Sequence, residues 1–369
     1  MSLRASTTRQ RGAWGHWVAR TCVRVGVQVG AHLVRRPLLL WSVAMVGLVW
    51  LALGAGAAQV RGADWLAPWQ AGEAPLTGPA YVLWHLRLPR VAFAALMGAA
   101  LGLTGALTQG LFRNPLADPG LLGVSSGAAC AAALAIVFLA GTPADGPQAW
   151  RPFLLPAAAF AGAMLVCLVL DRLARWLMAD AIAGLLLTGI ALNALAGAVI
   201  GLCTYLASDE QLRTLTFWTL GSLAAASWPL VVVLGLLLCV GWLASRWLRQ
   251  ALNALALGEA AAAHVGIDVR RVRTQVIVLV ALISGFAVAW CGMVGFVGLI
   301  APHIARRVVG ADQRRVLPAS MAVGAVLLLA ADTLARSVAV PAEVPVGLFT
   351  SLMGAPFFLM LLAVRRQRE

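Results

Sequence analysis

The sequence predicts an all-α integral membrane protein that folds as a ten-span helical bundle in each subunit. Its composition indicates this fold class. Apolar residues make up 61% of the 369 residues and charged residues only 11%, whereas soluble domains carry about a quarter charged residues. A single soluble core could not bury this much apolar surface, so we expect lipid to surround much of the chain.

Ten apolar runs, separated by charged or polar segments, are the expected spans. A helix of roughly 20 residues crosses a hydrocarbon core of about 30 Å. The runs cover residues 38–58, 91–108, 121–139, 153–170, 182–206, 229–242, 276–291, 294–305, 317–338 and 346–364. The eighth run is short, which is typical of a tilted or broken helix inside a bundle. Residues 1–36 are expected to form a basic cytoplasmic N-terminal extension, followed by the ten-span domain at 37–369.

The arginines predict how the spans are oriented. All 28 basic residues are arginine. With the N-terminus in the cytoplasm, 22 of them fall in cytoplasmic segments and six outside, as the positive-inside rule requires. An even number of spans then places the C-terminus in the cytoplasm too. The net charge of +14 does not indicate nucleic-acid binding, because the arginines lie in short clusters between apolar runs.

The sequence lacks the residues that several other functions require. A nucleotide-binding P-loop needs a lysine and the chain has none, so a separate subunit must bind any ATP. The six cysteines form no CxxC pair and lie mostly in apolar runs, which indicates core residues rather than a metal site. We therefore expect no catalytic residues, no metal site and no permanently bound cofactor.

Ionisable residues inside the expected spans are few. Asp332 is the clearest, and it lies four residues before Arg336, so an ion pair near the outer end is expected. Carriers driven by ion gradients keep such residues near midspan. An ion-coupled secondary carrier is therefore the weaker hypothesis. A membrane enzyme or scaffold would need a polar cluster in the bundle, and none is visible.

Several long blocks of sequence resemble one family of transport proteins. The first begins with RLPR at 87–90 and continues as GAALGLTGALTQGLFRNPLADPGLLGVSSGA at 98–128. The others are LLLTGIALNAL at 185–195, LNALALGEAAAAHVGI at 252–267, GFVGLIAPHIARRVVGADQRRVLP at 295–318, ADTLAR at 331–336 and PAEVPVGLFTSLMGAPFF at 341–358. Over about residues 80–365 the chain is similar to the permeases that import iron-siderophores, haem and cobalamin.

The resemblance implies the permease subunit of an ATP-driven (ABC) importer in the bacterial inner membrane. Members are homodimers of ten-span subunits that bind two ATP-binding cassette subunits, and a periplasmic substrate-binding protein delivers their cargo. ATP is used by the partner subunit, so the chain itself is not an enzyme. Residues 205–223 are most similar to haem permeases. We expect haem to move from the periplasm to the cytoplasm by alternating access, with cobalamin or a ferric siderophore as the alternative cargo.

The resemblance assigns an outer docking role to Arg87, Arg90 and Arg336. All three fall on the expected outer face, where planar guanidinium groups suit the carboxylates of a binding protein. Ion pairs with Asp332 or Glu343 are the alternative interpretation of the same arginines.

A cytoplasmic loop at about 243–275 matches the helix that couples such permeases to their ATPase. Small residues there suit close insertion into a partner groove, and a solvated amphipathic loop is the alternative. The matching residues are Leu257, Gly258, Glu259, Ala263 and Gly266.

Two further sets of residues are expected along the transport pathway. Ile182, Ala183 and Gly184 fall where the family places its inner gate, and small or apolar side chains suit such a constriction. His85 and His303 are the candidates for a transient contact with haem, although a lone histidine is more often a hydrogen-bonded structural residue.

Overall fold

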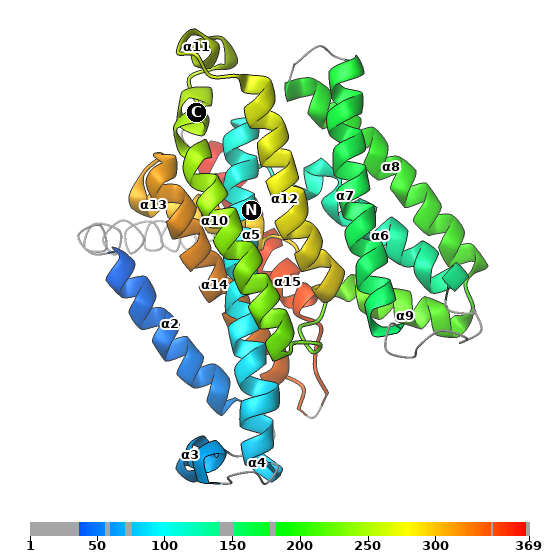
Figure 1. Ribbon diagram of the computed structural model, residues 1–369, viewed down its shortest axis with the longest axis vertical. Coiled ribbons are helices and arrows are strands. Elements are labelled where there is room, and N and C mark those ends of the chain that lie inside the picture. Colours follow the sequence, from blue (N-terminus) through cyan, green and yellow to red (C-terminus); the bar gives the residue numbers. More distant parts are fainter. Residues whose placement is uncertain are drawn as a thin grey trace, which may run out of the picture.

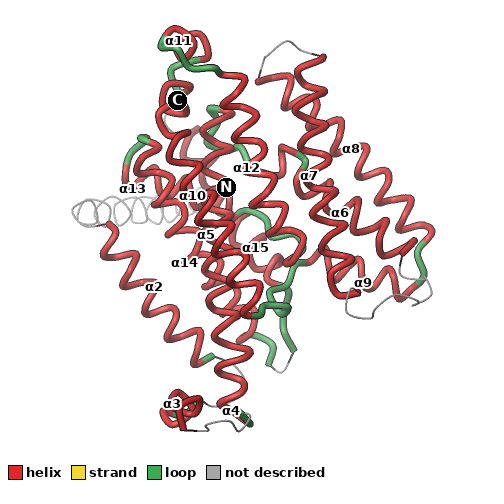
Figure 2. Tube along the Cα trace, in the orientation of Figure 1, coloured by secondary structure: helices red, strands yellow, loops and turns green. Residues whose placement is uncertain are grey.

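The computed structural model describes residues 37–55, 60–70, 76–139, 151–177, 182–340 and 342–366. Figure 2 shows that all the regular structure in these ranges is helical, with no strand among the described residues. The predicted all-α class is confirmed. The basic extension at residues 1–36 lies outside the described residues.

A helix occupies each of the ten ranges predicted as spans. These helices are α2 (Pro37–Gly54), α5 (Leu88–Phe112), α6 (Val124–Leu134), α7 (Arg151–Leu177), α8 (Ile182–Leu206), α10 (Trp228–Leu255), α12 (Val269–Cys291), α13 (Val297–Val309), α14 (Gln313–Ser337) and α15 (Val346–Arg366). Among the described residues, six helices are long and apolar enough to cross a membrane, namely those containing α5, α7, α8, α10, α12 and α14. These six helices indicate that the chain is a multi-span membrane protein. The full count of ten spans stays a prediction.

Shorter helical segments connect or extend the spans. They are α3 (Gly62–Gln70), α4 (Gly78–Tyr81), η1 (Val82–Arg87), η2 (Pro119–Leu122), η3 (Ala135–Leu139), α9 (Asp209–Leu220) and α11 (Glu259–His264). Because α4 and η1 lead directly into α5, the second span begins well before the apolar run that predicted it.

The loop predicted at 243–275 is shorter in the structure. The helix α10 continues to Leu255 and α12 begins at Val269, which leaves only residues 256–268 between them. The arginines after residue 242 do not end α10, because one face of the helix stays buried through Leu248, Leu252 and Leu255. The guanidinium of Arg249 lies 4.2 Å from the ring centroid of Trp242, a cation–π contact that keeps this charge against the helix.

The centre of the molecule is α5, which packs against α10, α12, α13 and α14 (Figure 1). Close contact between helices depends on small residues. A Cβ atom at Gly98 would collide with the backbone of Gly324, and one at Gly102 with the backbone of Ser320. The crossing of α5 and α14 therefore requires glycine at these positions.

A second group of helices, α6 to α9, lies beside this centre and joins it mainly through packing of α7 on α12 (Figure 1). A Cβ atom at Gly285 of α12 would lie 3.2 Å from the Cβ of Ala163 on α7. The glycines of α8 differ, because a Cβ at Gly197 or Gly201 would meet no atom within 4 Å. These two glycines therefore pack against nothing that the structure describes.

Candidate functional site

An ion-pair network joins the start of α5 to the end of α14 on the predicted outer side. Nε and Nη2 of Arg90 donate to the carboxylate of Asp332 at 2.9–3.3 Å, and Nη1 donates to Glu343 at 2.7 and 2.9 Å. Arg336 pairs with Asp332 from one helical turn away, at 3.2 Å. The ion pair expected from the sequence between Asp332 and Arg336 is confirmed.

Two arginines at this end, Arg87 and Arg336, also bind the backbone of α2. Nη1 of Arg87 donates to the carbonyl of Leu53 at 2.8 Å, and Nη2 of Arg336 donates to that of Ala52 at 3.1 Å. Both arginines are buried, with 6% and 7% of their surface exposed. Since α2 ends within two residues of these carbonyls, the charged groups complete the hydrogen bonding of its last turn.

Arg90 and Arg336 balance the charges of Asp332 and Glu343, and the neighbouring Arg87 adds one positive charge at this end. Asp332 is fully buried, whereas the Glu343 side chain is 47% exposed. Arg90 and Arg336 thus make the ion pairs that were the alternative to docking, and Arg87 donates to the backbone carbonyl of Leu53. Only the Arg90–Glu343 pair lies where solvent or a partner reaches it, so the docking role stays a prediction.

The predicted coupling segment protrudes at the other end of the molecule, where Figure 1 shows α11 beyond the ends of α10 and α12. Gly258 and Gly266 bracket α11 with φ angles of 118° and 83°, a backbone region that favours glycine. Leu257 is 81% exposed, and Ala263 is exposed as well. The segment therefore presents apolar side chains to its surroundings.

Two polar contacts hold this end in place. Glu259 pairs with Arg113, the residue that ends α5, at 3.6 Å. Near the end of α10, the Asn253 amide donates to Asp312 at 2.7 Å and accepts from the backbone N–H of Gln313 at 2.9 Å. The backbone N–H of Arg314 and the Asn253 amide hold the pKa of Asp312 below its usual range.

The predicted gate lies at the first turn of α8. The backbone of Ile182, Ala183 and Gly184 begins this helix, and Gly184 is buried. The side chains of Ile182 and Ala183, and the preceding residues 178–181, lie outside the described part of the chain. The gate role stays a prediction.

The two candidate haem-contacting histidines belong to elements at different ends of the molecule. The ring of His85, on η1, stacks on Tyr81 with 4.7 Å between centroids. His303, on α13, meets the ring of Phe357 edge to face at 6.0 Å. Figure 1 places α13 far from α4, which leads into η1. Among the described residues, no three His, Cys, Asp or Glu side chains gather as a metal site would require.

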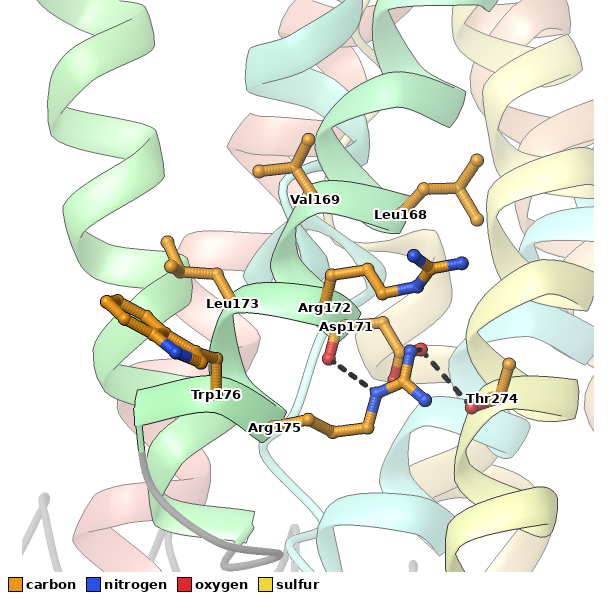
Figure 3. Close-up of a pocket in the computed structure, with 8 residues that line it drawn as sticks. All are labelled: Leu168, Val169, Asp171, Arg172, Leu173, Arg175, Trp176 and Thr274. Carbon is orange, nitrogen blue, oxygen red and sulfur yellow. Dashed lines mark hydrogen bonds and ion pairs between the residues drawn. The ribbon is translucent and has the colours of Figure 1, made fainter.

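A polar pocket between α7 and α12 was not predicted from the sequence. Figure 3 shows Asp171, Arg172, Arg175 and Thr274 in its wall, below Leu168 and Val169. An acid followed four residues later by an arginine at the end of an apolar run is the sequence signal that could have indicated it.

The features of the described chain are those of a membrane permease subunit: a helical bundle, an arginine network at one end and an apolar segment protruding at the other. The chain belongs to the FecCD transport family, whose model matches residues 44–364. It is therefore an ABC importer permease without an ATPase site of its own, and ATP hydrolysis takes place in separate subunits.

Individual relatives align with most of the chain. It is 41% identical over 338 residues to the hemin transport system permease protein HmuU of Yersinia pestis, covering 90% of this chain and 97% of that protein. It is 40% identical over 302 residues to the vitamin B12 import system permease protein BtuC of Vibrio cholerae, covering 81% of this chain and 86% of that one. A metal-chelate type ABC transporter, solved in an inward-facing conformation, matches with a TM-score of 0.74 and 31% identity, covering 89% and 99%.

Proposed function

We propose that this permease imports haem from the periplasm to the cytoplasm by alternating access. The observation that carries the proposal is the 41% identity to a hemin permease across 90% of the chain. The vitamin B12 permease is similar at 40% over a shorter stretch, so cobalamin is the main alternative cargo and a ferric siderophore the next. The partners would be a second copy of the chain, two ATP-binding cassette subunits and a periplasmic binding protein.

The two ends of the molecule suit the two kinds of partner. The excess of arginines over carboxylates at the end that holds Arg87, Arg90 and Arg336 favours a binding protein with surface carboxylates. The exposed apolar segment around Leu257 and Ala263 is suited to a groove in an ATPase. This arrangement requires the N- and C-termini to be cytoplasmic in an inner-membrane protein of ten spans. The open glycine face of α8 at Gly197 and Gly201 supports close packing of a second copy there.

Docking at Arg90 would involve an exchange of carboxylates. Glu343 already occupies Nη1 of Arg90 and is itself half exposed. A carboxylate of the binding protein would take the place of Glu343, while Asp332 keeps the other edge of the guanidinium. The internal pair therefore competes with docking and sets its affinity.

The test of the cargo is uptake into proteoliposomes that hold this chain with its ATPase. Haem-loaded binding protein is placed on one side, ATP on the ATPase side, and excess cobalamin or ferric siderophore serves as competitor. ATP-dependent haem uptake that ignores the competitors is the expected result. Uptake of a competitor alone would overturn the haem assignment, and uptake without ATPase would overturn the importer assignment.

The test of docking compares two outer-side substitutions. Glu343→Gln removes the competing carboxylate, so affinity for the binding protein should rise by about threefold to tenfold, the range of one exposed charge contact. Arg61 is an exposed arginine near the same end, so Arg61→Gln should leave the affinity unchanged. Unchanged or weaker binding by Glu343→Gln would show that Arg90 is not the docking group.

A further inference from the structure

A cavity of about 780 Å³ opens between the ends of α7 and α12. Polar groups form one part of its wall and the apolar side chains Leu168 and Val169 another. Figure 3 shows the two parts at different heights along α7, with the polar groups nearer the end of the helix. On the predicted orientation this end faces the cytoplasm. The pocket lies on other elements than the arginine network, and Thr274 of its wall belongs to α12, the helix that follows α11.

Part of the polar wall is fixed by internal contacts. Nη2 of Arg175 pairs with the carboxylate of Asp171 at 2.8 Å, and its Nε donates to the Asp171 backbone carbonyl at 3.1 Å. The hydroxyl of Thr274 on α12 donates to the same carboxylate at 3.2 Å. The Asp171 side chain is only 4% exposed. The bond from Thr274 connects α12 to α7. The two contacts with Asp171 hold Arg175 in one orientation.

The remaining positive charge has no compensating group among the residues that the structure describes. Arg172 is exposed and has no hydrogen bond or ion pair with any residue that the structure describes. Figure 3 shows its guanidinium extending toward α12, on the same side of α7 as that of Arg175. Two arginines and one aspartate leave a single net positive charge in a cavity whose upper wall is apolar. An anion with an apolar portion is the matching ligand.

The depth of the pocket in the membrane indicates which anion this is. Trp176 lies beside it with 80% of its surface exposed, and exposed tryptophans mark the boundary between lipid and water. The apolar span of α7 ends at the same turn. Basic pockets between helices on the cytoplasmic side are sites at which lipid headgroups bind. A soluble phosphate would leave the Leu168 and Val169 wall unoccupied.

We propose that this pocket binds an anionic phospholipid of the cytoplasmic leaflet. The phosphate accepts hydrogen bonds from Arg172 and from Nη1 of Arg175, which no described residue uses, and the upper acyl chain lies along Leu168 and Val169. The bound lipid bridges α7 and α12, the two helices through which the α6–α9 group joins the centre of the molecule. This site is distinct from the arginine network and from α11.

The experiment is native mass spectrometry of the full chain in detergent, titrated with phosphatidylglycerol, with phosphatidylcholine in a parallel series. Phosphatidylglycerol should bind at least about tenfold more tightly than phosphatidylcholine, because only phosphatidylglycerol carries a net negative charge. Arg172→Gln should weaken phosphatidylglycerol binding by about tenfold and Arg172→Lys by less. Because Arg172 has no partner in the described chain, the thermal unfolding of these variants should match that of the unaltered protein.

The matched control is Arg307→Gln, which removes the same charge from an exposed position on α13 on the same predicted side. It should leave lipid binding unchanged. Equal affinity for the two lipids, or equal weakening by Arg172→Gln and Arg307→Gln, would overturn the proposal. Displacement of the lipid by sn-glycerol 3-phosphate would show a site for soluble phosphate and would overturn it as well.

Discussion

Replacing Asp332 by asparagine removes a buried charge that two guanidinium groups share. The carboxylate is fully buried and accepts from Arg90 and Arg336 at 2.9–3.3 Å. Removing one partner of a buried pair costs about 3–5 kcal/mol, because the remaining charge stays desolvated. Arg90 keeps Glu343 in the variant, whereas Arg336 keeps only a backbone carbonyl. We therefore expect Asp332→Asn to lower the free energy of unfolding by about 3 kcal/mol, the low end of that range.

The assay is reversible unfolding of the purified chain in mixed micelles, followed by circular dichroism. The matched control is Glu343→Gln, which removes a carboxylate from the same Arg90 at a half-exposed position and should cost less than about 1 kcal/mol. Asp332→Asn combined with Arg336→Gln should cost less than the sum of the two single changes. Equal costs for Asp332→Asn and Glu343→Gln would refute the view that burial gives the network its strength.

Three further outcomes are expected. Gly98→Val should lower the free energy of unfolding by about 3 kcal/mol, because the added side chain separates α5 from α14. Gly197→Val in the purified single chain should cost little. Similar losses of stability for the two variants in the same assay would contradict the view that only Gly98 lies at a close helix crossing. Ser208→Ala removes the N-terminal cap of α9 and should cost about 1 kcal/mol. Glu259→Gln should change stability by less than about 1 kcal/mol but reduce ATPase stimulation by the binding protein, and unchanged stimulation would show that its pair with Arg113 plays no part in coupling.

The spans were predictable because each is an apolar run that only lipid or a helix interface can cover. For α8 the predicted and observed bounds coincide at Ile182–Leu206. The end of α10 was not predictable from charge, because Arg249 folds back on Trp242 while the opposite face continues into the core. Short connecting helices such as α9 owe their existence to caps and local packing, which leave little apolar signal in the sequence.

The site was predictable only in part, since it depends on residues brought together by the fold. The Asp332–Arg336 pair follows from helical spacing alone. Arg90 and Glu343 are 253 residues apart in the sequence, and only the crossing of α5 and α14 at Gly98 and Gly324 brings them together. Likewise, Thr274 joins Asp171 through the packing of α12 on α7, for which the sequence offers no local signal.

The helix α5 is tied at both of its ends. Arg90 in its first turn holds α14 and Glu343, and Arg113 just past its last turn holds Glu259 of α11. The two arginines are 23 positions apart in the sequence, which corresponds to about 35 Å of helix. Backbone contacts with α14 leave no room for this stretch to bend locally. Because the backbones of α5 and α14 touch at Gly98 and Gly324, a displacement of either end of α5 would displace α14 with it, and the two helices would move as one rigid pair.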